Sequence, residues 1–245
     1  MSDAPDLPDV LTDELSAALN QLATATLTHQ LMQRGIRTTF LAGLKPLNPN
    51  QRMVGRARTL RYVALREDQQ HKYQPGLNAQ KRIVESIEPG DVLIMEARGV
   101  PDAATIGDIL AMRVFALGGQ GIVTDGALRD TPAIAEIGQP VYHSASHGAV
   151  LGRQHMPFAT DEPITCAGVF VEPGDVIVGD GEGVVVIPMA LVEEVVRDAL
   201  AVEEKEQFAF ERVQAGESIV GLFPLAESRQ ADFEAWRASR QESEQ

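Results

Sequence analysis

The chain has 245 residues, 44% of them apolar and 23% charged, which is typical of a globular protein with one large domain. Its formal net charge of −14 and its 5% of aromatic residues argue against nucleic-acid binding, which usually needs a basic stripe. The single Cys166 excludes an internal disulfide and a multi-cysteine zinc site. Without a signal-peptide pattern or an apolar run of about 20 residues, we expect a cytoplasmic protein with no membrane partner.

The first third of the chain predicts helices followed by one strand. Residues 1–9 suit a flexible lead. Leucines then recur at roughly helical spacing up to Arg34, which predicts one or two helices that end at Gly35. The stretch "RMVGRARTLRYVAL" (52–65) alternates enough to be a strand, and residues 72–87 suit a helix.

The rest of the chain alternates between strands and helices. It predicts a buried strand at "DVLIMEA", a helix over 105–117, a short strand "GIVTDG" that breaks into a tight turn, and a strand "PVYHSA". Val-rich segments over 168–188, separated by Gly turns, predict antiparallel strands, and long helices follow over 189–214 and 224–242. We therefore predict one α/β domain over 10–214 with a helical extension over 215–245.

Thr105 and Asp108 stand three residues apart at the start of a predicted helix, which is the spacing of an acidic capping box. In that interpretation Asp108 only satisfies free N–H groups and the helix dipole. The functional interpretation uses the same geometry. With Gly107 before it, the helix start exposes N–H groups to a ligand carboxylate, and Asp108 faces a cation or an ordered water. Both interpretations stay open at this point.

The stretch "TDGALRD" (124–130) ends in an arginine beside an aspartate. Because Asp130 precedes a Thr-Pro pair, it suits the cap of a short helix, with Arg129 as a weak surface partner. Alternatively, Asp108 and Asp130 follow two strands of one sheet, where ligands of α/β proteins collect. Two aspartates without His or Cys favour a hard cation, Mg²⁺ or Mn²⁺, and Arg129 then offers a two-pronged donor to a carboxylate or enolate.

The other titratable residues carry weaker signals. His143 and His147 have a ligand-like spacing in "HSASH", but the segment predicts a strand and a loop and lacks the glutamate of a zinc-binding helix. His147 suits a proton-transfer group or, more often for a loop residue, a ring bonded to backbone. Arg66 is more typical of a surface charge than of a residue that binds a second carboxylate of the substrate. Nothing indicates a buried Schiff-base amine among Lys45, Lys72, Lys81 and Lys205.

The stretch "GDILAMRVFALGGQGIVTDGALRD" (107–130) resembles the central motif of the RraA-like family, named for a regulator of ribonuclease activity. That family also contains class II, metal-dependent aldolases that split 4-hydroxy-4-methyl-2-oxoglutarate and 4-carboxy-4-hydroxy-2-oxoadipate. The resemblance continues through "TATLTHQLMQRG", "MVGRARTL" and "PGDVIVGDGEGVVVIP". It implies a β/β/α swivelling fold like the phosphohistidine domain, here with helical extensions at both ends, and homotrimers or homohexamers with active sites between subunits.

Carried over residue by residue, the resemblance assigns roles to the central motif. It implies that Arg129 binds the substrate and steadies an enolate, that Asp130 is the principal metal carboxylate, and that Asp108 holds metal-bound waters. The pyruvyl carboxylate is then bound by the backbone of Gly107, Asp108, Ile109 and Leu110. A neighbouring subunit supplies a glutamate in the family. The candidates here, each of which also suits a solvated helix face, are Glu203, Glu204 and Glu206.

The predicted function is that of a lyase that cleaves a 4-hydroxy-2-oxo acid through a pyruvate enolate, with Mg²⁺ or Mn²⁺ as cofactor and oxaloacetate decarboxylation as a side activity. An alternative enzyme is a hydro-lyase of a 2-oxo-3-deoxy sugar acid. The non-enzymatic alternative is a regulator that binds a protein partner of a ribonuclease assembly. Because family members described as regulators lack the metal-binding aspartate, Asp130 favours the enzyme.

Overall fold

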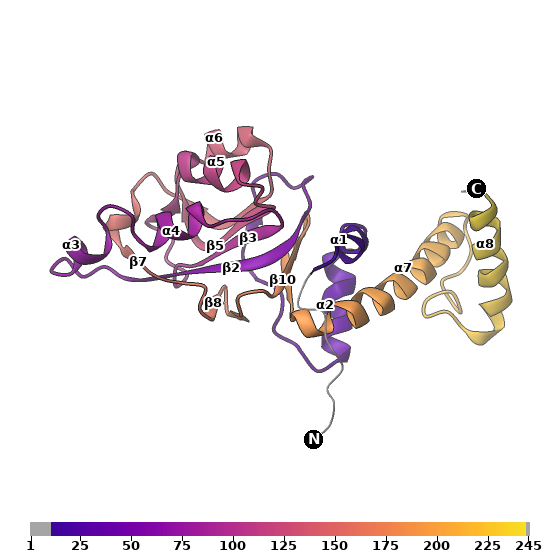
Figure 1. Cartoon of the computed structure of the whole chain (residues 1–245). Helices are drawn as coiled ribbons and strands as arrows, with labels where there is room; N and C mark the ends of the chain where they lie inside the picture. Colours follow the sequence, from indigo (N-terminus) through magenta and orange to yellow (C-terminus); the bar gives the residue numbers. More distant parts are fainter. Residues whose placement is uncertain (1–10, 244–245) are drawn as a thin grey trace, which may run out of the picture.

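The computed structural model describes residues 11–243, so the predicted lead over 1–9 lies outside the described residues. The chain folds around a curled nine-stranded sheet with helices packed against it (Figure 1). The expected α/β fold with helices at both ends is confirmed. The strands are β1 (Lys45–Pro46), β2 (Met53–Ala64), β3 (Asp91–Glu96), β4 (Ala104–Ile106), β5 (Gly121–Leu128), β6 (Val141–Ser146), β7 (His155–Thr160), β10 (Val176–Gly179) and β11 (Val184–Ile187), with a separate hairpin of β8 (Ile164–Cys166) and β9 (Val169–Val171).

The sheet follows the order β1-β6-β5-β3-β2-β10-β11, in which β4 also pairs with β5 and β7 with β2. The four strands β2, β3, β5 and β6 run parallel, and every residue of β5 is buried, as expected for a strand covered on both faces. The predicted break of the strand at Thr124–Gly126 is wrong. β5 continues to Leu128 with an irregular register between Thr124 and Ala127. The predicted antiparallel Val-rich pair is confirmed as the β10–β11 hairpin.

Two groups of helices cover the sheet (Figure 1). Helices α4, α5 and α6 share an apolar core with β3 and β5, whereas α1, α2 and the start of α7 pack on β10 and β11. In the part of the chain that the structure describes, the helices are α1 (Asp13–Leu19), α2 (Thr24–Gln33), α3 (Gln70–Tyr73), α4 (Ala79–Glu85), α5 (Asp108–Ala116), α6 (Thr131–Ile137), α7 (Val192–Gln214) and α8 (Gln230–Ser243), with short 3₁₀ turns at Leu151–Arg153, Met189–Leu191 and Glu227–Arg229. None is both long and apolar enough to cross a membrane.

Two of the predicted helices are wrong in their extent. The helix expected over 72–87 is divided, because Gly76 adopts a positive φ of 63° and the Asn78 side chain caps a new helix, α4, by accepting from the Lys81 N–H. The helix expected from Thr105 begins only at Asp108, since Thr105 belongs to β4. The first helix is thus divided by local turn and capping residues, whereas at Thr105 the pairing of β4 with β5 overrides the local helix preference.

The C-terminal helices form an arm that leaves the body of the molecule. α7 runs away from the sheet, and α8 folds back along its far half (Figure 1). The two helices share a small aromatic core in which the Phe208 ring lies 5.6 Å from the rings of both Phe233 and Trp236. This core fixes α8 far from the central motif.

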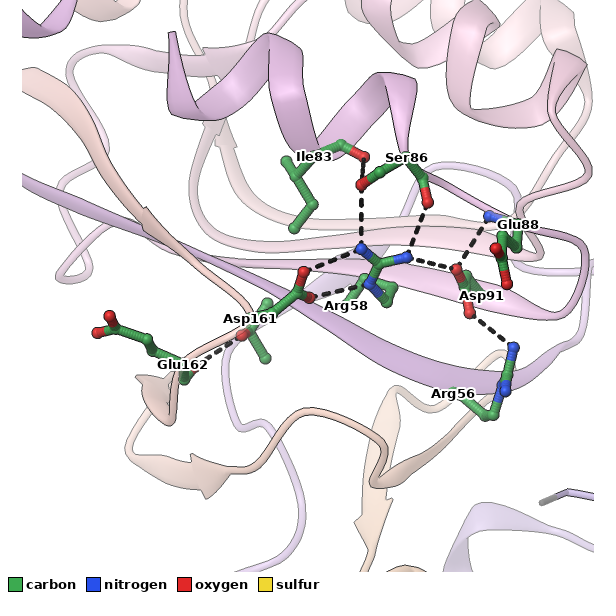
Figure 2. Close-up of polar contacts among 9 residues, drawn as sticks. Arg56, Arg58, Ile83, Ser86, Glu88, Asp91, Asp161 and Glu162 are labelled. Carbon is green, nitrogen blue, oxygen red and sulfur yellow. Dashed lines mark hydrogen bonds and ion pairs between the residues drawn. The ribbon is translucent and has the colours of Figure 1, made fainter. Parts of the chain in front are cut away.

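An ion-pair network around the buried Asp91 ties the parallel strands together at the start of β3. Asp91, whose side chain is 2% exposed, accepts from Arg56 at 3.2 Å and from Arg58 at 3.0 Å (Figure 2). Arg58 also makes a two-pronged contact with Asp161, with both N···O distances 2.9 Å. These carboxylates raise the pKa of Arg58 further, although burial opposes them. Two neighbouring arginines on β2 are therefore held by carboxylates of other segments.

Candidate active site at the start of helix α5

The central motif comes together because β4 pairs with the far end of β5. The two strands are parallel, and the Arg129 N–H donates to the Ile106 carbonyl at 3.0 Å. Both chains therefore leave the sheet side by side, one towards Gly107 and α5, the other towards Arg129 and α6. Ligands of α/β proteins commonly bind at such carboxyl ends of strands.

Gly126 allows this close pairing. A Cβ on Gly126 would lie 2.6 Å from Cβ of Ala97 and 2.9 Å from Cγ2 of Thr105, too close for any side chain. The preceding Asp125 is buried, and its carboxylate accepts from the N–H groups of Ala97 and Gly99, the latter at 3.1 Å. Burial raises the pKa of Asp125, and these hydrogen bonds partly oppose that rise. The residues 124–126 thus serve to place β4 and the loop after β3.

The predicted capping box at Thr105 and Asp108 is wrong. The Thr105 hydroxyl donates to the Ala127 carbonyl at 3.0 Å, so it stabilises the pairing of β4 with β5. The residue before the helix is Gly107, and no side chain caps α5 there. Within residues 11–243, the Asp108 carboxylate accepts from the next N–H, that of Ile109, at 2.8 Å. One N–H at the start of α5 is therefore occupied by Asp108, and the neighbouring ones can face an anion, helped by the helix dipole.

Asp130 also does not act as a helix cap. It precedes α6, but its side chain accepts no capping hydrogen bond, and its backbone is left-handed with φ 59° and ψ 34°. An aspartate tolerates this conformation better than most residues. Its carboxylate instead accepts from Nε of Arg129 at 3.0 Å, and the two side chains are 39% and 38% exposed. The carboxylate is thus presented at the surface of the site, with its outer lone pairs accessible.

The two halves of the motif meet at Gly107. A Cβ placed on Gly107 would lie 3.0 Å from Oδ2 of Asp130 and 3.4 Å from Nε of Arg129. The start of α5 and the Arg129–Asp130 pair are therefore in contact across a position that has no side chain. This arrangement brings Asp108, Arg129 and Asp130 into one small region, as the sequence predicts.

A cavity of about 300 Å³ opens beside this region. That volume is at the small end of the range for ligand sites, which suits a small organic acid. Residues 107–110 and Arg129 line it on one side. The cavity is completed by Ala104, Thr105, Ile106, Gln80, Lys81, Val150 and Leu151. Its walls are mainly apolar, and the polar groups are an arginine, a lysine, an aspartate, a glutamine, a threonine and the helix start.

The residues present fit a divalent cation that keeps most of its waters. Within residues 11–243, no three His, Cys, Asp or Glu side chains gather as a metal cluster. Mg²⁺ commonly needs only one or two carboxylates, together with waters and oxygens of the substrate. Asp130 and Asp108 supply that number, both from the region around Gly107.

The other sequence candidates have partners elsewhere. The His147 ring accepts from the Ala149 N–H at 3.0 Å, as expected for a loop histidine, and Arg66 pairs with Asp68 at the surface. His143 contacts the Lys45 carbonyl at 3.2 Å, and burial lowers its pKa.

Two of the three glutamates that were candidates for a subunit-bridging role are engaged within their own chain. Glu203 accepts from the Thr26 hydroxyl at 2.7 Å, and Glu204 pairs with Arg237 at 2.8 Å. Burial raises the pKa of the third, Glu206, and the nearby charge of Glu203 adds to that rise. All three lie on α7, which leaves the body away from α5 and α6 (Figure 1).

Four residues that line the cavity were not among the predicted site residues: Gln80, Lys81, Val150 and Leu151. Gln80 and Lys81 start α4, and the Gln80 amide donates to the Thr105 carbonyl at 2.6 Å. Val150 and Leu151 belong to the segment after β6. This segment is held against β4 because the Ala104 N–H donates to the Ala149 carbonyl at 3.0 Å. These residues are distant in sequence from the central motif and belong to no recognisable pattern, so only the folded chain identifies them.

An open helix start, a surface arginine–aspartate pair and a small cavity at strand ends thus lie together in an α/β protein, and such features are typical of sites for small anions. The comparisons identify the family. Residues 19–186 match the RraA-like model, described as Aldolase/RraA, and the chain belongs to this family.

Individual relatives agree with that assignment. A protein of Halalkalibacterium halodurans named putative 4-hydroxy-4-methyl-2-oxoglutarate aldolase is 34% identical over 66% of this chain and 72% of its own length. The structure of Streptomyces coelicolor RraAS2, described as an unusual member of the RNase ES inhibitor RraA protein family, is 34% identical with a TM-score of 0.75, over 81% of this chain and 96% of that one. An uncharacterised Pseudomonas syringae protein matches at 26% identity and a TM-score of 0.76, over 86% and 98%.

Proposed function

We propose that this chain is a divalent-metal-dependent lyase that cleaves a 4-hydroxy-2-oxo acid into pyruvate and a second carbonyl compound. The observation that supports this most is the contact of the Arg129–Asp130 pair with the open start of α5 at Gly107. Relatives named putative 4-hydroxy-4-methyl-2-oxoglutarate aldolase support the same reaction class.

Each residue has a role in the proposed reaction that follows from its chemistry. The N–H groups at the start of α5 bind the carboxylate next to the keto group. Arg129 donates to the keto oxygen and stabilises the charge that grows there as the C3–C4 bond breaks and the enolate forms. In this proposal Asp108, beside the same helix start, accepts the proton of the 4-hydroxyl through an ordered water. Protonation of the enolate at C3 then yields pyruvate.

We assign the metal to Asp130, with Asp108 as its outer partner. A bound Mg²⁺ or Mn²⁺ would supply Lewis acidity for the 2-oxo acid unit. The left-handed backbone at Asp130 directs its carboxylate to Arg129 and Gly107 instead of to the N–H groups of α6. The hydrogen bond from Nε of Arg129 restrains the carboxylate that would hold the metal.

The same enolate chemistry gives oxaloacetate decarboxylation, which therefore serves as a simple assay. We expect turnover that requires Mg²⁺ and stops with EDTA. Asp130→Asn keeps the shape of the side chain and tolerates the left-handed backbone, so it tests the charge alone. We expect its loss of kcat to exceed the roughly 10–100-fold cost typical of removing an outer partner of a metal site. Asp68→Asn, which breaks the exposed pair with Arg66, is the matched control and should keep full activity.

Two alternatives predict other outcomes. A regulator of ribonuclease activity, like the RNase ES inhibitor family to which RraAS2 belongs, would act by binding a protein and would be indifferent to Asp130→Asn. A hydro-lyase would release water from a 2-oxo-3-deoxy sugar acid and leave the carbon skeleton intact. Wild-type protein that shows no metal-dependent turnover above the metal-only background would contradict the proposed lyase.

We also propose that the chain assembles as a trimer or a dimer of trimers. Ile109 and Met112 on α5 are 78% and 50% exposed, and Val150 beside the cavity is 55% exposed. Apolar side chains so exposed around a polar site suit a contact with another subunit. Light scattering combined with size-exclusion chromatography measures the mass, and a monomeric mass would contradict this proposal.

A further inference from the structure

The cavity beside Gly107 has an acceptor group to which the proposed reaction gives no role. Gln80, at the start of α4, lines the cavity and is only 3% exposed. Its amide nitrogen donates to the Thr105 carbonyl at 2.6 Å, and the Tyr62 hydroxyl donates to the same carbonyl at 2.8 Å. Because a carbonyl oxygen can only accept, the amide nitrogen of Gln80 must face Thr105, and its oxygen Oε1 points elsewhere.

The side-chain oxygen of Gln80 is left for a group in the cavity. No N–H or O–H group within residues 11–243 donates to Oε1 of Gln80, and protein atoms do not fully enclose it. Its accessible part therefore belongs to the cavity wall. The hydroxyl of Thr105, on the same wall, already donates to the Ala127 carbonyl. A nearly buried acceptor needs a donor from water or from a ligand, since an unmade hydrogen bond there costs free energy.

Asp108 offers a second acceptor in the same cavity, through a carboxylate that accepts from the Ile109 N–H. We propose that Gln80 is a positioning residue that, together with Asp108, orients the water that takes the proton of the 4-hydroxyl of the substrate. One water can donate its two hydrogens to Oε1 of Gln80 and to Asp108, which leaves a lone pair to accept from the 4-hydroxyl. This inference rests on the proposed function, in which that proton passes to Asp108 through water.

Gln80 acts in this step only by orientation, because its amide is not a base. As the C3–C4 bond breaks, its electron pair enters the enolate and C4 becomes a carbonyl carbon. The 4-hydroxyl gives its proton to the water, and a proton of that water passes to the Asp108 carboxylate. Oxaloacetate decarboxylation forms the same enolate by loss of CO₂ and has no hydroxyl proton to transfer. Gln80 should therefore matter for cleavage of the hydroxy acid and not for decarboxylation.

The test compares these two reactions in the same protein. Pyruvate release from 4-hydroxy-4-methyl-2-oxoglutarate and from oxaloacetate is followed in the presence of Mg²⁺. Gln80→Met keeps the length of the side chain but removes the amide. We expect it to lower kcat for the hydroxy acid about tenfold with little change in KM, as for the loss of one hydrogen bond that is needed during the reaction. The rate of oxaloacetate decarboxylation should stay near that of wild type.

Tyr62→Phe is the matched control, because it removes the other hydrogen bond to the Thr105 carbonyl and Tyr62 does not line the cavity. We expect the ratio of cleavage to decarboxylation to fall in Gln80→Met and to keep its wild-type value in Tyr62→Phe. Gln80→Asn is the second variant. It keeps an amide beside Thr105 but withdraws the oxygen by one methylene, so it should show the same fall even where Gln80→Met is too unstable to assay.

The possible outcomes separate this inference from the proposed function. Equal losses in both reactions would make Gln80 a structural residue, and an unchanged ratio in both Gln80 variants would mean that the proton transfer does not depend on it. Either result overturns the inference while the lyase stands. Wild-type protein that does not cleave the hydroxy acid contradicts the proposed lyase, and the inference falls with it.

Discussion

Gly107→Ala tests the contact on which the proposed site depends. The backbone at Gly107, with φ −118° and ψ −178°, is extended and suits alanine. The added methyl group, however, would meet Oδ2 of Asp130 at 3.0 Å and Nε of Arg129 at 3.4 Å. The substitution therefore displaces the arginine–aspartate pair from the start of α5 without imposing backbone strain.

The size of the effect follows from these distances. An ordinary contact with a methyl carbon needs about 3.4 Å or more, so the pair must give way by a few tenths of an ångström. Because a misplacement of about 1 Å in an active site can cost a hundredfold in rate, we expect a loss of roughly five- to tenfold in kcat. Alanine is a poorer residue than glycine before a helix but restricts the unfolded chain, so the free energy of unfolding should change by less than about 1 kcal/mol.

The assay is Mg²⁺-dependent oxaloacetate decarboxylation, with thermal unfolding measured on the same samples. Gly148→Ala is the control, since a Cβ there meets no atom within 4 Å and the backbone φ is not positive. It should behave as wild type in both measurements. Wild-type kcat in the Gly107→Ala protein would refute the reasoning, because the pair would then not need its present position. A similar loss in both variants would point to a general effect on the cavity loops.

Two further predictions concern stability. Asp91→Ala leaves Arg56 and Arg58 facing an empty position (Figure 2), and we expect a loss near the lower end of the roughly 3–5 kcal/mol range, since both arginines reach solvent. Urea unfolding measures it. Glu85→Ala, which breaks an exposed ion pair, is the control and should unfold at nearly the same urea concentration as wild type. Burial raises the pKa of Asp175 to about 6, above its value in the unfolded chain. The contribution of Asp175 to the free energy of unfolding therefore falls as pH rises from about 4 to 6. Asp175→Asn should therefore be the more stable protein at pH 7 but not at pH 4, and equal stabilities at both pH values would contradict this assignment.

Local patterns in the sequence were sufficient to predict the helices and strands that depend on neighbouring residues. The strand after Asp91, the Val-rich β10–β11 hairpin and the long helix α7 all follow from periodicity and turn residues. The central motif also predicted which residues lie together. Gly107 and Arg129 each follow a short strand at the same end of the sheet, so parallel pairing brings them side by side.

Only the tertiary structure decided how these residues are used. Thr105 has the spacing of a helix cap, but pairing of β4 with β5 draws its hydroxyl to Ala127 and leaves the start of α5 open. Asp130 precedes a helix, but its left-handed backbone turns the carboxylate towards Arg129. Lys81 lines the cavity from α4, and the neighbouring Gln80 is bonded to Thr105 of β4. The sequence alone determined most of the elements but not all of their ends, because hydrophobic period and turn chemistry are short-range. The open helix start and the α4 wall of the cavity arise from contacts between segments far apart in the chain, which no local pattern encodes.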